Sequence, residues 1–134
     1  MTDITTASEE NWDHWKHDCS GFVHAVTNEL GAPLTGTANQ MVDDLTTAGN
    51  GWTALGNDPQ NAQDYANKGF LVIAGLKARG HGHVVIIVPV SQAQRYPVGY
   101  WGQYRGTGRK NTTINWSWNH DDLSKVQYFV RQIP

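Results

Sequence analysis

The N-terminal half of the chain carries apolar residues at helical spacing in two segments. In 19–30 the apolar positions recur every three or four residues, so they share one face of a helix: Cys19, Phe22, Val23, Val26 and Leu30. Asp18 suits the N-cap of this helix, and Gly31 with Pro33 ends it. The apolar positions in 38–48 predict a second helix in the same way.

The C-terminal half alternates apolar runs of strand length with polar or glycine-rich breaks. Strands are predicted at 70–77, 83–90, 96–104, 113–118 and 126–133. The first two are rich in β-branched residues and are expected to form a hairpin, whereas 106–110 and 119–125 are expected to be loops. The segment 51–68 is polar and is expected to be irregular with one short helix. Helices followed by strands predict an α+β fold, with N-terminal helices packed on an antiparallel sheet.

Length and charge narrow the classes of protein to which the chain can belong. A chain of 134 residues is expected to form a single domain over 1–134, with monomer as the default state. Acidic residues outnumber basic ones by 12 to 10, so no basic field draws the chain to nucleic acid or to a membrane surface. The longest apolar run, 84–90, is too short to span a bilayer. Residues 1–10 are polar and acidic, unlike a secretory signal, so export would need another carrier.

Cys19 is the first candidate for catalysis. A thiol attacks as the thiolate, and unpaired N–H groups at the start of a helix stabilise negative charge at the position that Cys19 occupies. The small Ser20 and Gly21 that follow leave room for a substrate carbonyl, and the same N–H groups can stabilise an oxyanion. The competing interpretation is inert packing, because Cys19 lies on the apolar helix face and free cysteine is commonly buried.

A cysteine nucleophile needs a base, and His83 is the candidate. It follows a glycine and opens an apolar strand, which places its ring where a buried strand emerges at an edge of the sheet. His81 lies two residues earlier and shares a strand face with His83, so the pair forms half of a conceivable metal site. No further ligand cluster accompanies the two histidines, so we expect neither a metal nor another cofactor.

These residues resemble the NlpC-type, papain-like peptidoglycan peptidases. The resemblance rests on DCSGFV at 18–23 opening a helix and on GHV at 82–84 opening a strand. The runs NQMV at 39–42, GFLVIAGLK at 69–77 and YP at 96–97 are similar to the first family of type VI secretion amidase effectors, over about residues 11–133. Members of that family pass from one bacterium into the periplasm of a rival, where they cut peptidoglycan stem peptides between D-glutamate and meso-diaminopimelate.

The resemblance implies a role for each matching residue. Cys19 would attack the γ-D-glutamyl carbonyl, and His83 would take the thiol proton and then protonate the leaving amine. His81 has no matching role. A third group that orients the base is implied on the strand after His83, where a backbone carbonyl around Trp101 is the best candidate. The implied partners are the stem peptide, type VI secretion components and a periplasmic immunity protein.

Two other functions fit the same residues. One is a cysteine acyl-transfer enzyme that acts on another bond, and the other is a non-catalytic wall-binding module with an inert thiol. Iodoacetamide is expected to separate the module from an enzyme, because a catalytic Cys19 should react at mildly acidic pH. Trp116 and Trp118 alternate within the predicted strand 113–118, so they are expected on one face, where core packing is favoured over stacking on carbohydrate.

Overall fold

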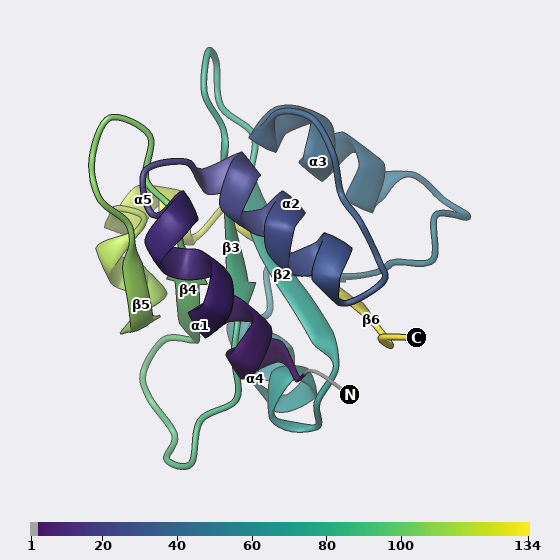
Figure 1. The fold of residues 1–134 in the computed structure, drawn as a ribbon. Coiled ribbons are helices and arrows are strands. Elements are labelled where there is room, and N and C mark those ends of the chain that lie inside the picture. The colour runs from purple at the N-terminus through teal and green to yellow at the C-terminus, as the bar shows by residue number, and fades with distance from the viewer. Residues whose placement is uncertain (1–2) are drawn as a thin grey trace.

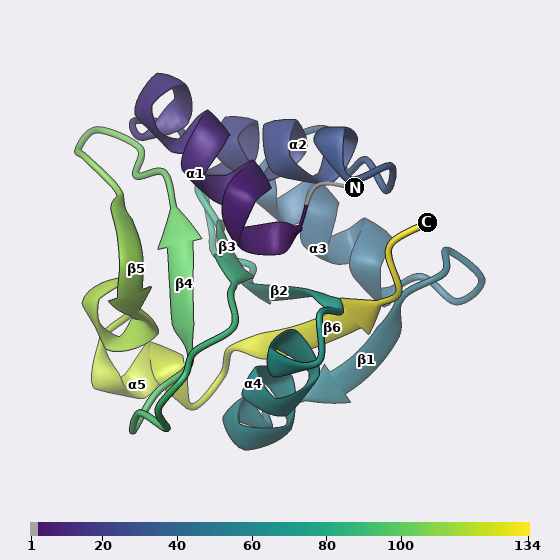
Figure 2. The same cartoon turned by 60° about the horizontal axis from the view of Figure 1, so that its bottom comes forward.

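A six-stranded antiparallel sheet lies between helices on both of its faces (Figures 1 and 2). The computed structural model describes residues 3–134. The helices are α1 (Ile4–Trp15), α2 (Cys19–Glu29), α3 (Ala38–Thr46), α4 (Pro59–Asn67) and α5 (His120–Leu123). Helices α1, α2 and α3 cover one face, and α4 lies on the other. No helix within 3–134 combines the length and the apolar character that a membrane crossing requires.

The order of strands in the sheet is β1-β6-β2-β3-β4-β5. Their bounds are β1 (Thr53–Gly56), β2 (Leu71–Leu76), β3 (His83–Ile87), β4 (Val98–Trp101), β5 (Arg109–Thr113) and β6 (Gln127–Arg131). The predicted hairpin is confirmed, because β2 and β3 pair antiparallel with Leu76 opposite His83. The α+β class is confirmed as well, and its arrangement of helices on an antiparallel sheet is that of a papain-like peptidase.

Alternation along the strands divides the hydrophobic core between the two faces of the sheet. On β2, Leu71 and Ile73 point into the core beneath α1, α2 and α3, whereas Val72 and Ala74 point into the core on the side of α4. All four side chains are fully buried. A strand that is covered on both faces reads as a continuous apolar run, which is why the sequence predicts β2 and β3 well.

Helix α1 is absent from the sequence-based expectations. Asp3 caps it by accepting a hydrogen bond from the Thr6 N–H at 2.7 Å. Few apolar residues mark its inner face, since only Ile4 and Ala7 are buried apolar residues in it and Trp12 is partly buried against the core. The polar composition of the first ten residues therefore conceals an amphipathic helix.

The segment after β4 is where the expectations were wrong. The strand predicted at 113–118 is not formed: β5 ends at Thr113, and Ile114–Trp116 is a 3₁₀ helix. Ile114 and Trp118 are buried four residues apart, which is helical spacing, and Trp116 between them is 63% exposed, so the two tryptophans do not share a face. Edge strand β5 lies partly in the predicted loop 106–110, and α5 lies in the predicted loop 119–125.

Candidate active site

Cys19 occupies the first position of α2. The Asp18 carboxylate caps this helix by accepting hydrogen bonds from the Gly21 N–H at 3.0 Å and from the Ser20 hydroxyl at 3.2 Å. The first N–H groups of a helix have no acceptor within the helix, and Cys19 and Ser20 are the first two residues of α2. Their N–H groups therefore lie at the positive end of the helix dipole, close to the sulfur.

The environment of Cys19 keeps its thiol protonated. Burial raises the pKa of Cys19, and the negative charge of Asp18 raises it further. The backbone amides of Val84, Ser20 and Cys19 itself act in the opposite direction without cancelling the effect. The Val84 amide belongs to β3, the strand that His83 opens, and Cys19 and His83 line the same cleft.

Close backbone contacts hold the turn before Cys19 against the sheet. A Cβ atom on Gly102 would lie 2.3 Å from the carbonyl oxygens of both Trp15 and Asp18. The next residue, Gln103, donates its N–H to the Lys16 carbonyl at 3.0 Å. Only glycine permits the backbone of residues 15–18 to lie this close to the end of β4. Gly102 therefore helps to set the distance between Cys19 and the sheet.

An asparagine on α3 holds the loop that leads to His83. Asn39 donates from Nδ2 to the Ala78 carbonyl at 2.8 Å and accepts the Ala78 N–H on Oδ1 at 3.1 Å. A Cβ atom on Gly82 would lie 2.2 Å from the same Oδ1. Asn39 and Gly82 thus position the start of β3, which gives a physical reason for the NQMV and GHV runs.

The His83 ring is enclosed by residues that follow the 3₁₀ helix. Its Nε2 lies 2.5 Å from the Ser117 hydroxyl oxygen, and the Trp118 ring packs edge-on with centroids 5.1 Å apart. Burial lowers the pKa of His83 from 6.5 to about 4. The imidazole is therefore neutral at physiological pH, as a general base must be.

The Trp101 carbonyl, expected to orient His83, is engaged elsewhere. It accepts a hydrogen bond from Trp12 Nε1 at 3.1 Å, and within residues 3–134 no hydrogen bond joins it to His83. The contact of His83 is instead with Ser117, which sequence reasoning missed. Ser117 is 34 positions away from His83 in the chain, and no local pattern marks it.

The candidate residues meet in one cleft of about 340 Å³. Its lining brings together residues from α2, β3 and the segments around them: Cys19, Leu76, Lys77, Ala78, His81, Gly82, His83, Gln103, Tyr104, Ser117, Trp118, Asp122 and Lys125. His81 does not join His83 in a ligand pair, because its ring stacks on Tyr104 with centroids 4.1 Å apart. Within residues 3–134 no group of three or more His, Cys, Asp or Glu side chains is arranged to hold a metal ion.

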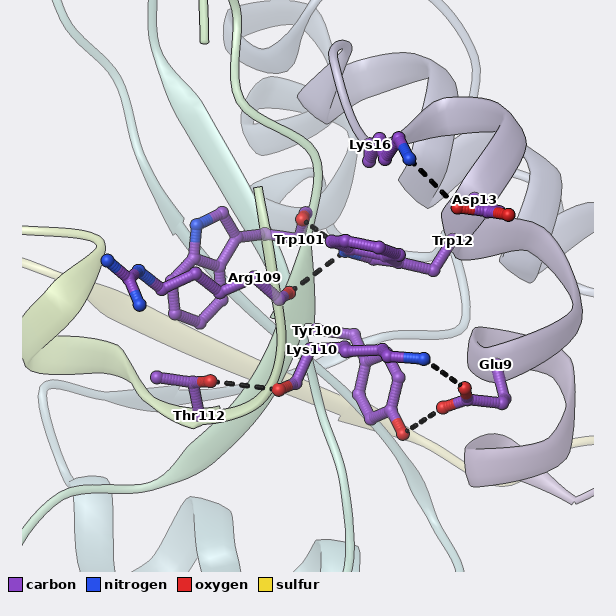
Figure 3. Close-up of polar contacts among 9 residues, drawn as sticks. All are labelled: Glu9, Trp12, Asp13, Lys16, Tyr100, Trp101, Arg109, Lys110 and Thr112. Atoms are coloured by element: carbon purple, nitrogen blue, oxygen red, sulfur yellow. Dashed lines mark hydrogen bonds and ion pairs between the residues drawn. The ribbon is translucent and has the colours of Figure 1, made fainter. Parts of the chain in front are cut away.

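A tryptophan on α1 contacts β4 and β5, the two strands whose connecting loop contributes Gln103 and Tyr104 to the cleft (Figure 3). Trp12 donates from Nε1 to the carbonyl oxygens of Trp101 and Arg109, each at 3.1 Å. The ammonium groups of Lys16 and Lys110 each lie 5.4 Å from the centroid of the Trp12 ring. Helix α1 is thereby attached to both β4 and β5.

A carboxylate one turn earlier on α1 strengthens this attachment. Glu9 accepts hydrogen bonds from the Tyr100 hydroxyl at 2.6 Å and from the Lys110 ammonium (Figure 3). The Lys110 contact, followed by the Tyr100 contact, lowers the pKa of Glu9. Burial and the neighbouring Glu9 charge raise the pKa of Tyr100, so its hydroxyl stays a donor.

Taken together, the geometry suits base-assisted attack by a neutral thiol. Within residues 3–134 no hydrogen bond joins Cys19 to His83, and the two pKa shifts both favour the uncharged forms. A preformed thiolate–imidazolium pair is therefore disfavoured at rest. The proton must move during the reaction, when a substrate carbonyl is present to receive the sulfur.

Comparison with known proteins supplies an independent line of evidence. No protein-family model matches the sequence. The chain is 37% identical over 140 aligned positions to the peptidoglycan amidase Tse1 of Pseudomonas aeruginosa. The alignment covers 95% of this chain and 88% of the relative, so the similarity extends over the whole fold and not over one motif.

Proposed function

This chain belongs to the family of type VI secretion amidase effectors that includes Tse1, and from that premise we propose that Cys19 and His83 hydrolyse an amide bond in peptidoglycan. The protein is a peptidoglycan amidase of α+β fold, and the proposal adds that it is a cysteine peptidase. The observation that carries it is that Cys19, at the N-terminus of α2, and His83, at the start of β3, line the same cleft.

The proposed reaction proceeds through a thioester. His83 takes the Sγ proton as the sulfur attacks the amide carbon, and the N–H groups of Cys19 and Ser20 receive the oxyanion. The C–N bond then breaks while the imidazolium returns its proton to the leaving amine. Water, deprotonated by His83, attacks the thioester and releases the acid together with the thiol.

The bond between D-glutamate and meso-diaminopimelate is the proposed substrate. This assignment rests on the resemblance of the motifs and on the relative's activity toward peptidoglycan. Delivery by a type VI system, action in the periplasm of a target cell and neutralisation there by an immunity protein belong to the same proposal. The cell-wall substrate lies in the periplasm, so the enzyme harms only cells whose periplasm it enters.

Digestion of Gram-negative sacculi tests the proposal. Wild type should release peptides that end in D-glutamate, identified by mass spectrometry, whereas Cys19→Ala and His83→Ala should release none. His120→Ala is the matched control, because His120 is an exposed histidine outside the cleft and its loss should leave cleavage intact. Uncut sacculi with wild type would overturn the amidase assignment, and cleavage by Cys19→Ala would overturn the role of the thiol.

A further inference from the structure

Within residues 3–134, the His83 imidazole makes one hydrogen-bond contact, and its partner is the Ser117 hydroxyl. Nε2 and Oγ lie 2.5 Å apart, and the Trp118 ring packs against the imidazole in an edge-on arrangement. A buried polar atom without a partner is destabilising, so the orientation of this ring depends on the serine.

Ser117 is held by a rigid support of its own. The 3₁₀ helix before it is anchored by Ile114, which is fully buried and donates its N–H to the Pro97 carbonyl at 3.0 Å. The N–H groups of Ser117 and Trp118 both donate to the Ile114 carbonyl, at 2.8 and 3.1 Å. The hydroxyl is therefore presented to the ring by a fixed turn and not by a mobile loop.

We propose that Ser117 is the positioning residue of this active site, accepting a hydrogen bond from His83 Nε2–H so that Nδ1 is free to take the proton of Cys19. The proposal deepens the proposed function, since it supplies the third group of the Cys19–His83 pair from the turn after β5 and not from β4. Nδ1 is the ring nitrogen that hydrogen bonding of Nε2 to Ser117 leaves available, and Cys19 lines the same cleft as His83.

The hydrogen bond changes strength during the reaction. In the resting state it joins two neutral groups, whereas after proton transfer the donor is an imidazolium, and charge-assisted hydrogen bonds are roughly twice as strong. Ser117 therefore stabilises the charged state more than the resting state, which is the condition for accelerating a reaction. Its loss should slow proton transfer and leave substrate binding nearly unchanged.

Alkylation of Cys19 tests this role without any peptidoglycan substrate. Cys19 is the one cysteine of the chain, so a mass increase with iodoacetamide reports on it alone. At neutral pH, Ser117→Ala should react about 10- to 100-fold more slowly than wild type, as expected for loss of a hydrogen bond to a charged group. Ser117→Thr keeps the hydroxyl and should restore most of the rate. The control is Ser124→Ala, because the Ser124 hydroxyl donates to the exposed Asp121 carbonyl at 2.6 Å and Ser124 does not line the cleft.

The pH profile separates positioning from a structural defect. Above the pKa of the thiol, thiolate forms without help from His83, so the rates of wild type and Ser117→Ala should converge at alkaline pH. In peptide hydrolysis, Ser117→Ala should lower kcat with KM unchanged. Equal rates at neutral pH, or an equal deficit at every pH, would overturn the proposal. If wild type cuts no sacculi but the alkylation pattern holds, the substrate assignment fails and the role of Ser117 stands.

Discussion

Substitution of Gly102 by alanine is expected to destabilise the contact between the end of β4 and the turn that precedes Cys19. The added Cβ would lie 2.3 Å from the carbonyl oxygens of Trp15 and Asp18, a separation that real Cβ atoms essentially never show. Both neighbours are backbone atoms, which cannot rotate aside as a side chain can. Either the end of β4 or the turn before Cys19 must move.

The size of the effect follows from the two contacts. Overpacking of a well-packed region costs about 1–3 kcal/mol, and two rigid backbone neighbours place Gly102→Ala near the upper end, at about 3 kcal/mol. Gly106→Ala is the matched control in the same loop, because its nearest neighbour is the flexible Gln103 side chain at 3.3 Å. Replacing glycine by alanine reduces the conformational entropy of the unfolded chain to the same extent in both variants, so that term cancels between them.

Urea denaturation of wild type, Gly102→Ala and Gly106→Ala measures the difference directly. Gly102→Ala should lower the midpoint at an unchanged slope, with a melting temperature about 10 °C below that of the control. Displacement of Cys19 by about 1 Å should also reduce hydrolysis about 100-fold. Stabilities of Gly102→Ala and Gly106→Ala that agree within error would refute the argument that backbone contact at Gly102 sets the position of the thiol.

Two further predictions concern protons. The pKa of His83 is about 4 in the folded protein and 6.5 ordinarily, so between these pH values the unfolded chain binds more protons than the folded protein. Lowering the pH through this range should therefore cost about 3 kcal/mol of folding stability. The urea midpoint should fall more steeply with decreasing pH for wild type than for His83→Gln, and parallel curves would contradict this. Because the pKa of Cys19 is raised and His83 is neutral, alkylation by iodoacetamide should be slow near about pH 5 and rise continuously toward about pH 10, contrary to the sequence-based expectation of reaction in mild acid. A rate already at its plateau in mild acid would show a preformed thiolate.

The elements that the sequence predicts well are those that the fold buries. Helix α2 has its apolar residues on one face, and β2 and β3 are covered on both faces, so their patterns are clear. No residue of the edge strands β1 and β5 is fully buried, and their composition does not differ from that of a loop. Burial in the interior requires apolar residues at regular positions, which the sequence reveals. Backbone hydrogen bonding at the edge of a sheet requires no particular side chains.

Some residues of the candidate site can be found from local sequence, and others only from the structure. Cys19 and His83 each stand at the start of an element and within a recognisable motif, so local sequence points to them. Ser117 reaches His83 only because the chain turns back after β5, and Trp12 reaches β4 and β5 across 89 and 97 positions. Such contacts are properties of the tertiary structure, which no local motif encodes.

The place of β6 inside the sheet determines the order in which the sheet can be completed. β6 spans Gln127–Arg131 and yet lies between β1 and β2, so its two neighbours cannot join one sheet until it arrives (Figure 2). A chain without β6 can pair β2 with β3, β4 and β5, but it leaves the edge strand β1 without a neighbour in the sheet. The last step in completing the sheet therefore joins segments that are far apart in the sequence, and such long-range pairing is the slow part of folding.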